Sequence, residues 1–546
     1  MAEGSRLILV AWLAMAALHL GVSVGGSSAP GLFYDEAIQA GPSLDFVRGG
    51  VRALHPPGLS TVSLLGRPFP WMTQAYMGAL KSQLLIPSFA LFEPSPAVLR
   101  TTTTLWALTG VLFVMLWAGR VLGRSVALVG GALLMADPTL LFVARHDWGS
   151  VGLALLCRGA GLYFASLGWS TRRPLHLALA GLAFGLGLYN KVDFAAFLGA
   201  AALALLAVRP GLLGEVRHRR ELRWGVLAFV VGAAPMVAWV PKLIHAAALL
   251  ETRGPFSERL LVAWSSLDGS YFYRLMSVGG RYEQLFDGAD VPVGLLAIAV
   301  PTSLALLAAL AWRAPRCLPS PRALVFVVIA GGLSQLALLA MPGAQRVHHM
   351  MNVQPFPQLL VASALVALWR ARPHGLARYV ARAAAGTALV ALLAADARVV
   401  ARTFDLLEAS GGRGYWSDAI ERFAEEVEGE PAATVVSLDW GFHPPLLLLT
   451  RTPRLLEPIW HLRRGAGPDR GWRHEGDADH LYLVHDPAYD RFGPGPDFLE
   501  QVAELPPRFA ETRVYRDRQG AVAFLAIRLT RPHRLFFQGR LRLVVH

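Results

Sequence analysis

Eleven separate apolar segments, each about 15 to 20 residues long, are the feature that most limits how this chain can fold. A segment of this length can cross the hydrocarbon core of a bilayer, which is about 30 Å thick, as a helix. The chain is therefore predicted to be an all-α polytopic membrane protein with about 11 transmembrane helices. The segments lie near residues 7–24, 101–118, 125–142, 151–167, 175–189, 194–208, 224–240, 293–312, 323–341, 353–369 and 379–395.

The composition agrees with this class of protein. Of the 546 residues, 54% are hydrophobic and only 16% are charged, which is too apolar for an ordinary soluble enzyme. The net charge of +13 raises the question of a nucleic-acid partner. However, the basic residues form short clusters between apolar segments, as cytoplasmic loops of membrane proteins do, so no nucleic-acid partner is predicted. The two cysteines, Cys157 and Cys317, have no plausible disulfide or metal partner in the sequence.

The distribution of basic residues also predicts the orientation. The first apolar segment is longer than the core of a typical signal peptide, so we expect it to be retained as the first span, with a cytoplasmic N-terminus. Loops then assigned to the inside are several-fold richer in Lys and Arg than those outside. Integral location in the cytoplasmic membrane is therefore predicted, with the outer loops 25–98 and 241–290 and everything after residue 396 outside the cytoplasm.

Two regions outside the spans carry further patterns. Within the first outer loop, residues 70–85 mix apolar and polar side chains, which favours either a helix lying on the membrane surface or a soluble helix packed on the bundle. After the transmembrane domain, residues 1–395, the character of the sequence changes. Strands are predicted at 434–438 and 480–485, a helix at 497–505 and a hairpin over 512–529 that turns at Arg518-Gln519-Gly520. Residues 396–546 are thus expected to form a small α/β extracytoplasmic domain.

Asp35 and Glu36 follow the first span directly, in a loop where water and substrate can reach them. Two adjacent carboxylates at this place suggest catalysis at a membrane surface. The alternative interpretation is a helix start, in which Asp35 caps the first turn.

Other charged residues stand at the predicted ends of spans. Asp137 precedes Pro138, a pair typical of a capped helix start. If the fourth span is helical from Asp147, Arg158 lies eleven residues on, on the same face and about 16 Å deeper, where a structural role is favoured over substrate contact. Lys191 is suited either to hold a phosphate as a point charge or to anchor the helix at the membrane surface.

A basic group precedes the tenth apolar segment: Arg346, His348 and His349. Adjacent histidines on a helix do not face one metal site, so hydrogen bonding to an anionic head group is the preferred interpretation. Residues 439–443 end a predicted strand and suit a turn better than a substrate contact. The sequence contains no phosphate-binding loop, no His-Glu-x-x-His and no Gly-x-Ser-x-Gly.

Together these residues resemble the C-type superfamily of membrane glycosyltransferases. The chain is most similar to the family related to protein O-mannosyltransferases and to the aminoarabinose transferase that modifies lipid A. The resemblance covers most of residues 7–369. It rests on Tyr34-Asp35-Glu36-Ala37, Tyr76-Met77-Gly78-Ala79-Leu80-Lys81, residues 138–147, Lys191, His348-His349 and Pro355-Phe356-Pro357.

The resemblance implies transfer of a sugar from a polyisoprenyl-phosphate donor to a hydroxyl of a lipid, glycan or protein acceptor. The reaction would take place outside the cytoplasm with inversion at the anomeric carbon. By the family motif, Asp35 would be the base, Glu36 its neighbour and Asp147 a second acidic residue. No metal ion or other cofactor is required by the sequence, although some superfamily members use a divalent metal. The candidate substrate-binding residues are Lys81, Arg145, Lys191, Arg346, His348 and His349.

Two other functions remain open at this point. The first is a flippase or transporter of lipid-linked sugars, in which an intramembrane charge such as Arg158 would mark the translocation path. The long outer loops and the lack of an internal repeat argue against it. The second is a noncatalytic membrane assembly protein that has kept the fold.

Overall fold

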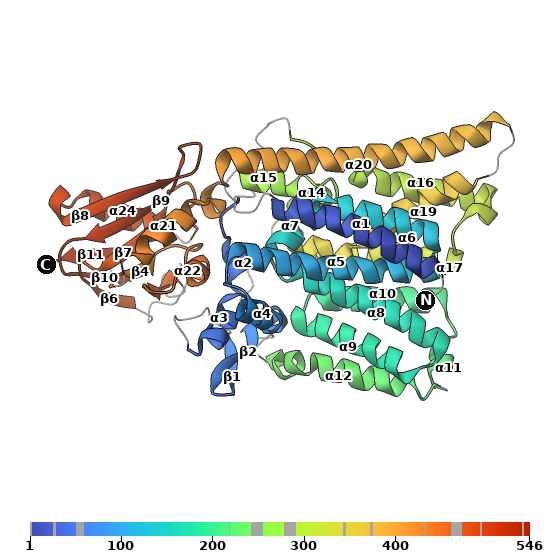
Figure 1. The fold of residues 1–546 in the computed structure, drawn as a ribbon, viewed down its shortest axis with the longest axis horizontal. Coiled ribbons are helices and arrows are strands. Elements are labelled where there is room, and N and C mark those ends of the chain that lie inside the picture. The colour runs from blue at the N-terminus through green and yellow to red at the C-terminus, as the bar shows by residue number, and fades with distance from the viewer. Residues whose placement is uncertain are drawn as a thin grey trace.

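The computed structural model shows a bundle of long helices with a domain of mixed sheets at one end (Figure 1). In Figure 1 the bundle helices run side by side along the longest axis, and the C-terminal strands lie beyond the ends of α2 and α20. The structure describes residues 3–25, 29–50, 59–217, 219–241, 255–277, 291–341, 346–371, 375–430, 432–459, 472–491, 494–537 and 540–546.

Helices in the bundle coincide with the predicted apolar segments. Six of the described helices are long and apolar enough to span a membrane, and the number rises to eight if two bent pairs each count as one span. The bundle helices are α1 (Glu3–Gly25), α5 (Pro96–Val121), α6 (Arg124–Ala136), α7 (Pro138–His146), α8 (Val151–Thr171), α9 (Pro174–Asn190), α10 (Phe194–Val208), α12 (Leu222–Ala238), α14 (Phe256–Leu267), α16 (Leu296–Arg313), α17 (Pro321–Ala340), α19 (Phe356–Arg370) and α20 (Leu376–Ser410).

The multi-pass membrane architecture is thus confirmed, but the predicted count of about eleven spans exceeds six to eight. The difference lies in α9, α10 and α12, which have 17, 15 and 17 residues. A hydropathy pattern reports how apolar a segment is, whereas helix length is set by the residues that end it. Helix α10, for example, begins after Asp193 and ends before Arg209.

One bent pair is organised by Asp137. Helices α6 and α7 meet at 61°. One carboxylate oxygen of Asp137 accepts hydrogen bonds from the backbone N–H groups of Thr139 (2.8 Å) and Leu140 (3.2 Å), which is the N-cap predicted for this residue. The other oxygen accepts from the side-chain amides of Gln354 (3.0 Å) and Gln358 (2.6 Å). The cap therefore also joins the bend to the start of α19.

The second bend, of 44°, separates residues 347–353 from α19 and is held by Arg158. The Arg158 guanidinium donates to the backbone carbonyl of Gln354 and to the side chain of Asn352 (2.8 Å). Arg158 is 1% exposed. This matches the structural role that the sequence favours for a deep arginine.

The first outer loop differs from its prediction. Residues 70–85 do not form one helix: β1 (Ser60–Leu64), β2 (Arg67–Gln74) and β3 (Met77–Gly78) make a small antiparallel sheet, and α4 (Leu80–Leu91) begins only after it. Leu65 and Gly66, with φ of 53° and 74°, form the tight turn that pairs β2 with β1, so residues 70–74 lie in a strand and not in a helix. Gly78 is required where the chain turns into α4, because a Cβ there would lie 2.1 Å from the backbone oxygen of Tyr189. Two short helices complete the loop, α2 (Tyr34–Ala37) and α3 (Gly41–Arg48).

The C-terminal region contains both strands and the hairpin that the sequence predicts. A five-stranded sheet has the order β5-β4-β7-β9-β8, in which β5, β4 and β7 are parallel and β9 and β8 antiparallel. Gly520, with φ +87°, lies in the turn of the predicted hairpin. The elements are β4 (Thr434–Ser437), β5 (Arg454–Leu456), β7 (His480–His485), β8 (Ala510–Arg516), β9 (Val522–Leu529), a second sheet of β6 (Trp472–Gly476), β10 (His533–Phe537) and β11 (Leu541–Val545), and helices α21 (Ala419–Glu428), α22 (His443–Leu449) and α24 (Pro494–Ala503).

The predicted domain boundary at residue 396 falls inside α20, which continues without a break to Ser410. Of the predicted outer loop 241–290, residues 242–254 and 278–290 lie outside the described part of the chain. Between them are α14 and α15 (Tyr271–Ser277).

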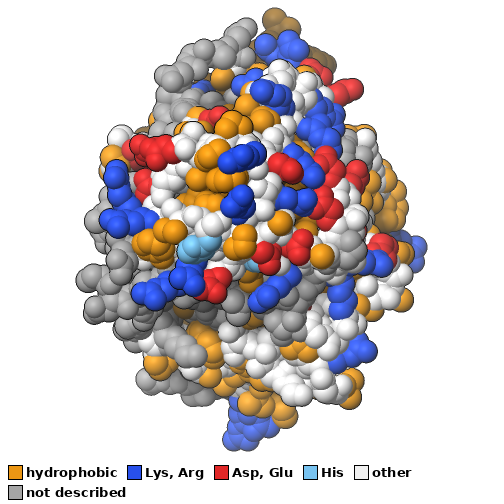
Figure 2. Space-filling model, turned by 90° about the vertical axis from the view of Figure 1, so that its left-hand side faces the viewer, with side chains coloured by type: hydrophobic (Ala, Val, Ile, Leu, Met, Phe, Trp, Pro, Cys, Tyr) orange, Lys and Arg blue, Asp and Glu red, His pale blue; other side chains and the backbone are white. Residues whose placement is uncertain are grey.

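The outer face of the C-terminal domain has the mixed surface of a water-exposed domain. Figure 2 shows Lys or Arg, Asp or Glu and hydrophobic side chains interspersed on this face. Exposed large apolar side chains are instead concentrated on the bundle, as on α12, which exposes Val226, Val230 and Val231. This contrast is expected if the bundle is surrounded by lipid and the C-terminal domain by water.

Candidate active site

Helix α2 lies where the bundle meets the C-terminal domain. Aromatic side chains from both regions hold it there. Phe33 stacks on Trp416 with ring centroids 4.1 Å apart, and Tyr34 stacks on Trp440 at 4.5 Å. The adjacent carboxylates Asp35 and Glu36 are thereby fixed at this junction, pointing into different surroundings.

Glu36 is completely buried in a closed network. Arg100 donates to both of its carboxylate oxygens, at 2.6 and 3.1 Å, and the backbone N–H of Phe33 donates at 3.3 Å. Burial alone would raise the pKa of Glu36, but the positive charge of Arg100 outweighs it, and the pKa falls to about 2. Glu36 is 0% exposed. The Glu36 carboxylate is therefore ionised, and its oxygens are already hydrogen-bonded to Arg100 and Phe33. These contacts suit a residue that anchors α2.

Lys81 and Asp147 form a second closed pair directly beneath α2. Their charged groups are 3.1 Å apart, and both residues are 0% exposed. The Lys81 ammonium also donates to the backbone carbonyls of Glu36 (3.3 Å) and Asp147 (3.1 Å). The other Asp147 oxygen accepts from the N–H of Gly152 at 2.9 Å. Lys81 and Asp147, both candidates from the sequence, thus neutralise each other and position the loop.

Asp35 has different surroundings. It is partly exposed, and the indole N–H of Trp148 donates to one carboxylate oxygen at 2.6 Å. Burial raises the pKa of Asp35, against the charge of Arg491, the Trp148 hydrogen bond and the charges of Lys191 and Arg346. Three cations from distant parts of the chain therefore act on a single, partly exposed carboxylate.

Lys191 belongs to a group of polar side chains beside Trp148. The Lys191 ammonium lies 3.4 Å from Asp193, and His349 lies 3.0 Å from the same oxygen. Burial would raise the pKa of Asp193, but Lys191 and His349 lower it to about 2. The His348 ring is 4.9 Å from that of Trp148.

Gly149 allows this group to assemble. Its φ is +87°, and a Cβ there would lie 2.7 Å from the His348 ring and 3.2 Å from the Lys191 ammonium. The backbone between Trp148 and α8 therefore approaches both side chains closely, and only glycine fits.

The structure separates the remaining candidate from this group. Arg145 is 1% exposed, donates to the backbone carbonyl of Ala29 (3.0 Å) and has its guanidinium 5.5 Å from the Phe404 ring. Its contacts join α7 to the start of the outer loop and to α20. Of the remaining candidates, Lys191 and Arg346 act on the charge of Asp35, while His348 lies beside Trp148 and His349 is paired with Asp193.

Several residues at the junction were not identified from the sequence. Glu457 of the C-terminal domain accepts a hydrogen bond from the Tyr34 hydroxyl at 3.3 Å. The Arg491 guanidinium lies 4.6 Å from the Trp440 ring, which is itself stacked on Tyr34. Nothing in the local sequence marks Arg491 or Glu457. Trp148 does have a signal in the sequence, because it directly follows residues 138–147, which carry part of the family resemblance.

The parallel strands β5, β4 and β7 explain why the C-terminal domain presents these residues here, and Glu457 directly follows β5. Asp439 follows β4 and His485 ends β7, and their side chains are 2.9 Å apart. Asp439 also accepts from the backbone N–H groups of Trp440 (2.7 Å) and Arg491 (3.3 Å). Residues 439–443 thus have the turn role that the sequence favours, and the turn supports Trp440 and Arg491 next to α2. Among the described residues, no group of three or more His, Cys, Asp or Glu side chains is arranged to hold a metal ion.

Comparisons with known proteins add to this geometry. The family model described as dolichyl-phosphate-mannose-protein mannosyltransferase matches residues 83–239. The fold is similar to that of ArnT from Cupriavidus metallidurans bound to undecaprenyl phosphate, with a TM-score of 0.55 and 15% identity over 95% of this chain and 97% of that chain. For ArnT in the apo state the TM-score is 0.54, with 14% identity over the same shares.

A lower similarity, with a TM-score of 0.41 and 14% identity, is found to the Archaeoglobus fulgidus oligosaccharyltransferase tethered with an acceptor peptide, over 87% of this chain and 69% of that chain. No curated protein sequence matches the chain. The family match over α4 to α12 and the fold shared with ArnT confirm the resemblance found in the sequence. Residues 83–239 thus match the family model of dolichyl-phosphate-mannose-protein mannosyltransferases, and the chain as a whole has the fold of ArnT.

Proposed function

We propose that the chain transfers a sugar from a polyisoprenyl-phosphate donor to an acceptor hydroxyl, with Asp35 as the general base. The donor class is supported by the family match and by the undecaprenyl phosphate bound to the ArnT that shares this fold. The acceptor class is a hydroxyl of a lipid, glycan or protein.

The observation that carries the proposal is the difference among the four carboxylates around Trp148. Glu36, Asp147 and Asp193 are each held in an ion pair with a buried cation. Within the described ranges, Asp35 has no such pair, receives one neutral hydrogen bond and remains partly exposed. A base needs a lone pair that substrate can reach, and Asp35 meets that condition.

The proposed reaction is a single displacement. The acceptor hydroxyl gives its proton to Asp35 while its oxygen forms a bond to the anomeric carbon of the sugar. The bond from that carbon to the phosphate oxygen breaks, and the polyisoprenyl phosphate leaves. Attack opposite the leaving group inverts the anomeric configuration.

The cations near Asp35 have a matching role in this proposal. The leaving phosphate gains negative charge, which Lys191 and Arg346 would stabilise. Trp148 would keep one Asp35 oxygen in place and leave the other for the acceptor proton. His348 and His349 would complete the phosphate side, His349 through its hydrogen bond to Asp193.

We further propose that this reaction takes place outside the cytoplasm. The site lies at the end of the bundle that faces the C-terminal domain (Figure 1). The basic clusters that the sequence assigns to the cytoplasm include Arg313 at the end of α16 and Arg370 at the end of α19. Because α19 begins next to the site, its end lies toward the opposite surface of the membrane, as the positive-inside rule requires.

The experiment is transfer of label from a panel of radiolabelled polyprenyl-phosphate sugars to membrane acceptors by purified protein in lipid. Wild type is compared with Asp35→Asn and with Asp405→Asn, a matched change at an exposed carboxylate on α20. We expect transfer by wild type and by Asp405→Asn alone. Equal transfer by Asp35→Asn would remove Asp35 as the base. Movement of labelled lipid across proteoliposome membranes without sugar transfer would instead identify a flippase.

A further inference from the structure

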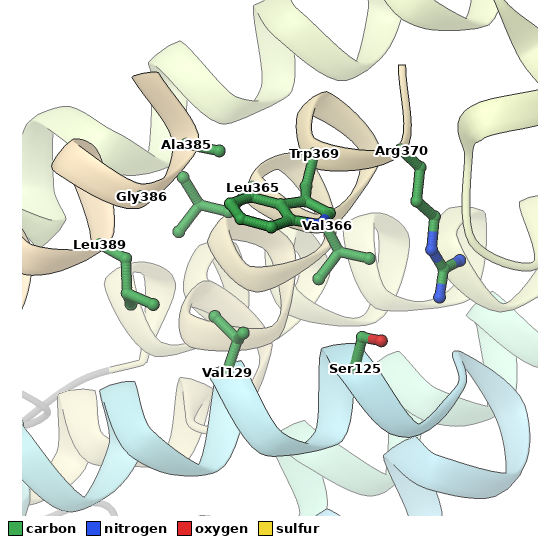
Figure 3. Close-up of a pocket in the computed structure, with 9 residues that line it drawn as sticks. All are labelled: Ser125, Val129, Leu365, Val366, Trp369, Arg370, Ala385, Gly386 and Leu389. Atoms are coloured by element: carbon green, nitrogen blue, oxygen red, sulfur yellow. The ribbon is translucent and has the colours of Figure 1, made fainter. Parts of the chain in front are cut away.

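A groove lies between α6, α19 and α20, at the far end of these helices from the candidate active site. Its volume is 230 Å³, and Figure 3 shows the side chains that surround it. In Figure 3, Val129 and Ser125 on α6 point toward α19, and the Arg370 side chain extends toward Ser125. Its lining includes Ser125 and Val129 of α6, Leu365, Trp369 and Arg370 of α19, and Gly386 of α20.

Gly386 lines this groove and has open space in front of it. It lies within the 35-residue helix α20, and a Cβ at this position would meet nothing within 4 Å. Apart from proline, glycine is the least favourable residue inside a helix. Neither a tight helix contact nor a positive φ explains the glycine here. The space in front of it has room for a ligand.

Arginines stand at one end of the apolar groove. Arg370 is itself part of the lining, and the Arg382 guanidinium lies 5.7 Å from the ring of Trp369. Arg378 precedes Arg382 by one helical turn on α20. None of these three forms an ion pair with a carboxylate in the part of the chain that the structure describes. Basic pockets between spans are suited to anionic lipid head groups, and tryptophan is common at the level of the head groups.

We propose that this groove binds an anionic phospholipid. One acyl chain lies against Val129, Leu365 and Gly386, and the phosphate is held by Arg370 and Arg382. The donor of the transfer reaction is excluded as the occupant, because α19 runs about 21 Å from Phe356 beside the site to Arg370. A phosphate held at Arg370 is therefore too far from Asp35 to react. The inference rests on the fold and does not depend on the proposed function.

The test is native mass spectrometry of the full chain released from lipid vesicles of phosphatidylcholine with phosphatidylglycerol. Gly386→Leu places a side chain in the groove, starting from a Cβ that meets nothing within 4 Å, and should lower the fraction of protein that retains phosphatidylglycerol. The matched control is Gly332→Leu, an exposed glycine in α17 whose added Cβ also meets nothing within 4 Å. We expect the control to retain lipid as wild type does.

A second pair of variants tests the head group. Arg370→Ala and Arg382→Ala should each weaken retention about fivefold, and only for the anionic lipid. Arg322→Ala, in the first turn of α17, is the control for a general loss of surface charge. Equal retention by wild type, Gly386→Leu and the two arginine variants would overturn the proposal. So would preferential retention of added undecaprenyl phosphate over phosphatidylglycerol by the wild-type groove.

Discussion

Two sides of helix α2 differ in how their charges are satisfied, although they begin from adjacent residues. On the Glu36 side, Arg100, Lys81 and Asp147 form closed, fully buried ion pairs. On the Asp35 side, a partly exposed carboxylate faces Lys191, Arg346 and Arg491 without a direct ion pair to a described residue. The comparison separates a carboxylate that is held in an ion pair from one that is available to a substrate.

The largest expected effect on activity comes from substitution of Asp35. Asp35→Asn removes the proposed base and keeps the shape, so kcat should fall about 100- to 10,000-fold. The melting temperature should stay near that of wild type, because no buried cation loses its partner. Sugar transfer and thermal unfolding in the same detergent measure the two effects. An inactive variant that is also unfolded would not support a catalytic role.

The matched change on the other side is Glu36→Gln. It leaves Arg100 buried without its counter-charge, which should lower the free energy of unfolding by about 3–5 kcal/mol. Because the pKa of Glu36 is about 2 in the folded protein against an ordinary 4.5, this stabilisation is present above about pH 4.5 and is lost as the pH falls toward 2. Thermal unfolding as a function of pH checks this. Loss of activity in fully folded Glu36→Gln would show that the two sides are not separate.

Substitution of Lys191 tests whether a positive charge near Asp35 stabilises the leaving phosphate. Lys191→Met should lower kcat about 100-fold by removing one charge from the leaving phosphate. Lys191→Arg should restore part of the activity, since it keeps the charge. Arg534→Met, at an exposed position of the C-terminal domain, serves as the control. Transfer rates that are the same for Lys191→Met and Arg534→Met would contradict the assignment.

The smallest expected effect is a shift in the pH dependence of the transfer rate, which reports the pKa of Asp35. Burial raises the pKa of Asp35, so the rate should fall with acidification at a higher pH than an ordinary aspartate would give. The charge of Arg491 opposes this rise, and Arg491→Met should therefore move the acidic limb to still higher pH. The rate at high pH should stay close to that of wild type. An increase in KM at every pH, without movement of the limb, would assign Arg491 to donor binding instead.

The sequence predicts the class of protein well and the site only in part. Membrane spans and strands are recognisable because each depends on a local pattern, as in residues 480–485, which form β7. The prediction for residues 70–85 failed because the mixed polarity of this segment suits a surface helix as well as a hairpin, and the Leu65-Gly66 turn that makes it a hairpin lies before the segment. Arg491 and Glu457 have no local pattern at all. They reach α2 only because the parallel strands β5 and β7, which precede Glu457 and Arg491 in the chain, end on the side of the domain that faces α2.

What the sequence by itself determined is the membrane-spanning bundle, the Asp35-Glu36 motif and the resemblance to membrane glycosyltransferases. These follow from composition and short motifs, which can be recognised without knowing how the chain folds. Only the tertiary structure decided which carboxylate is closed and which is open. Lys81, chosen from the sequence as a phosphate ligand, is buried against Asp147, while Asp35 is left partly exposed. The physical reason is that the state of a charge depends on its burial and on partners far away in the chain, which local sequence does not specify.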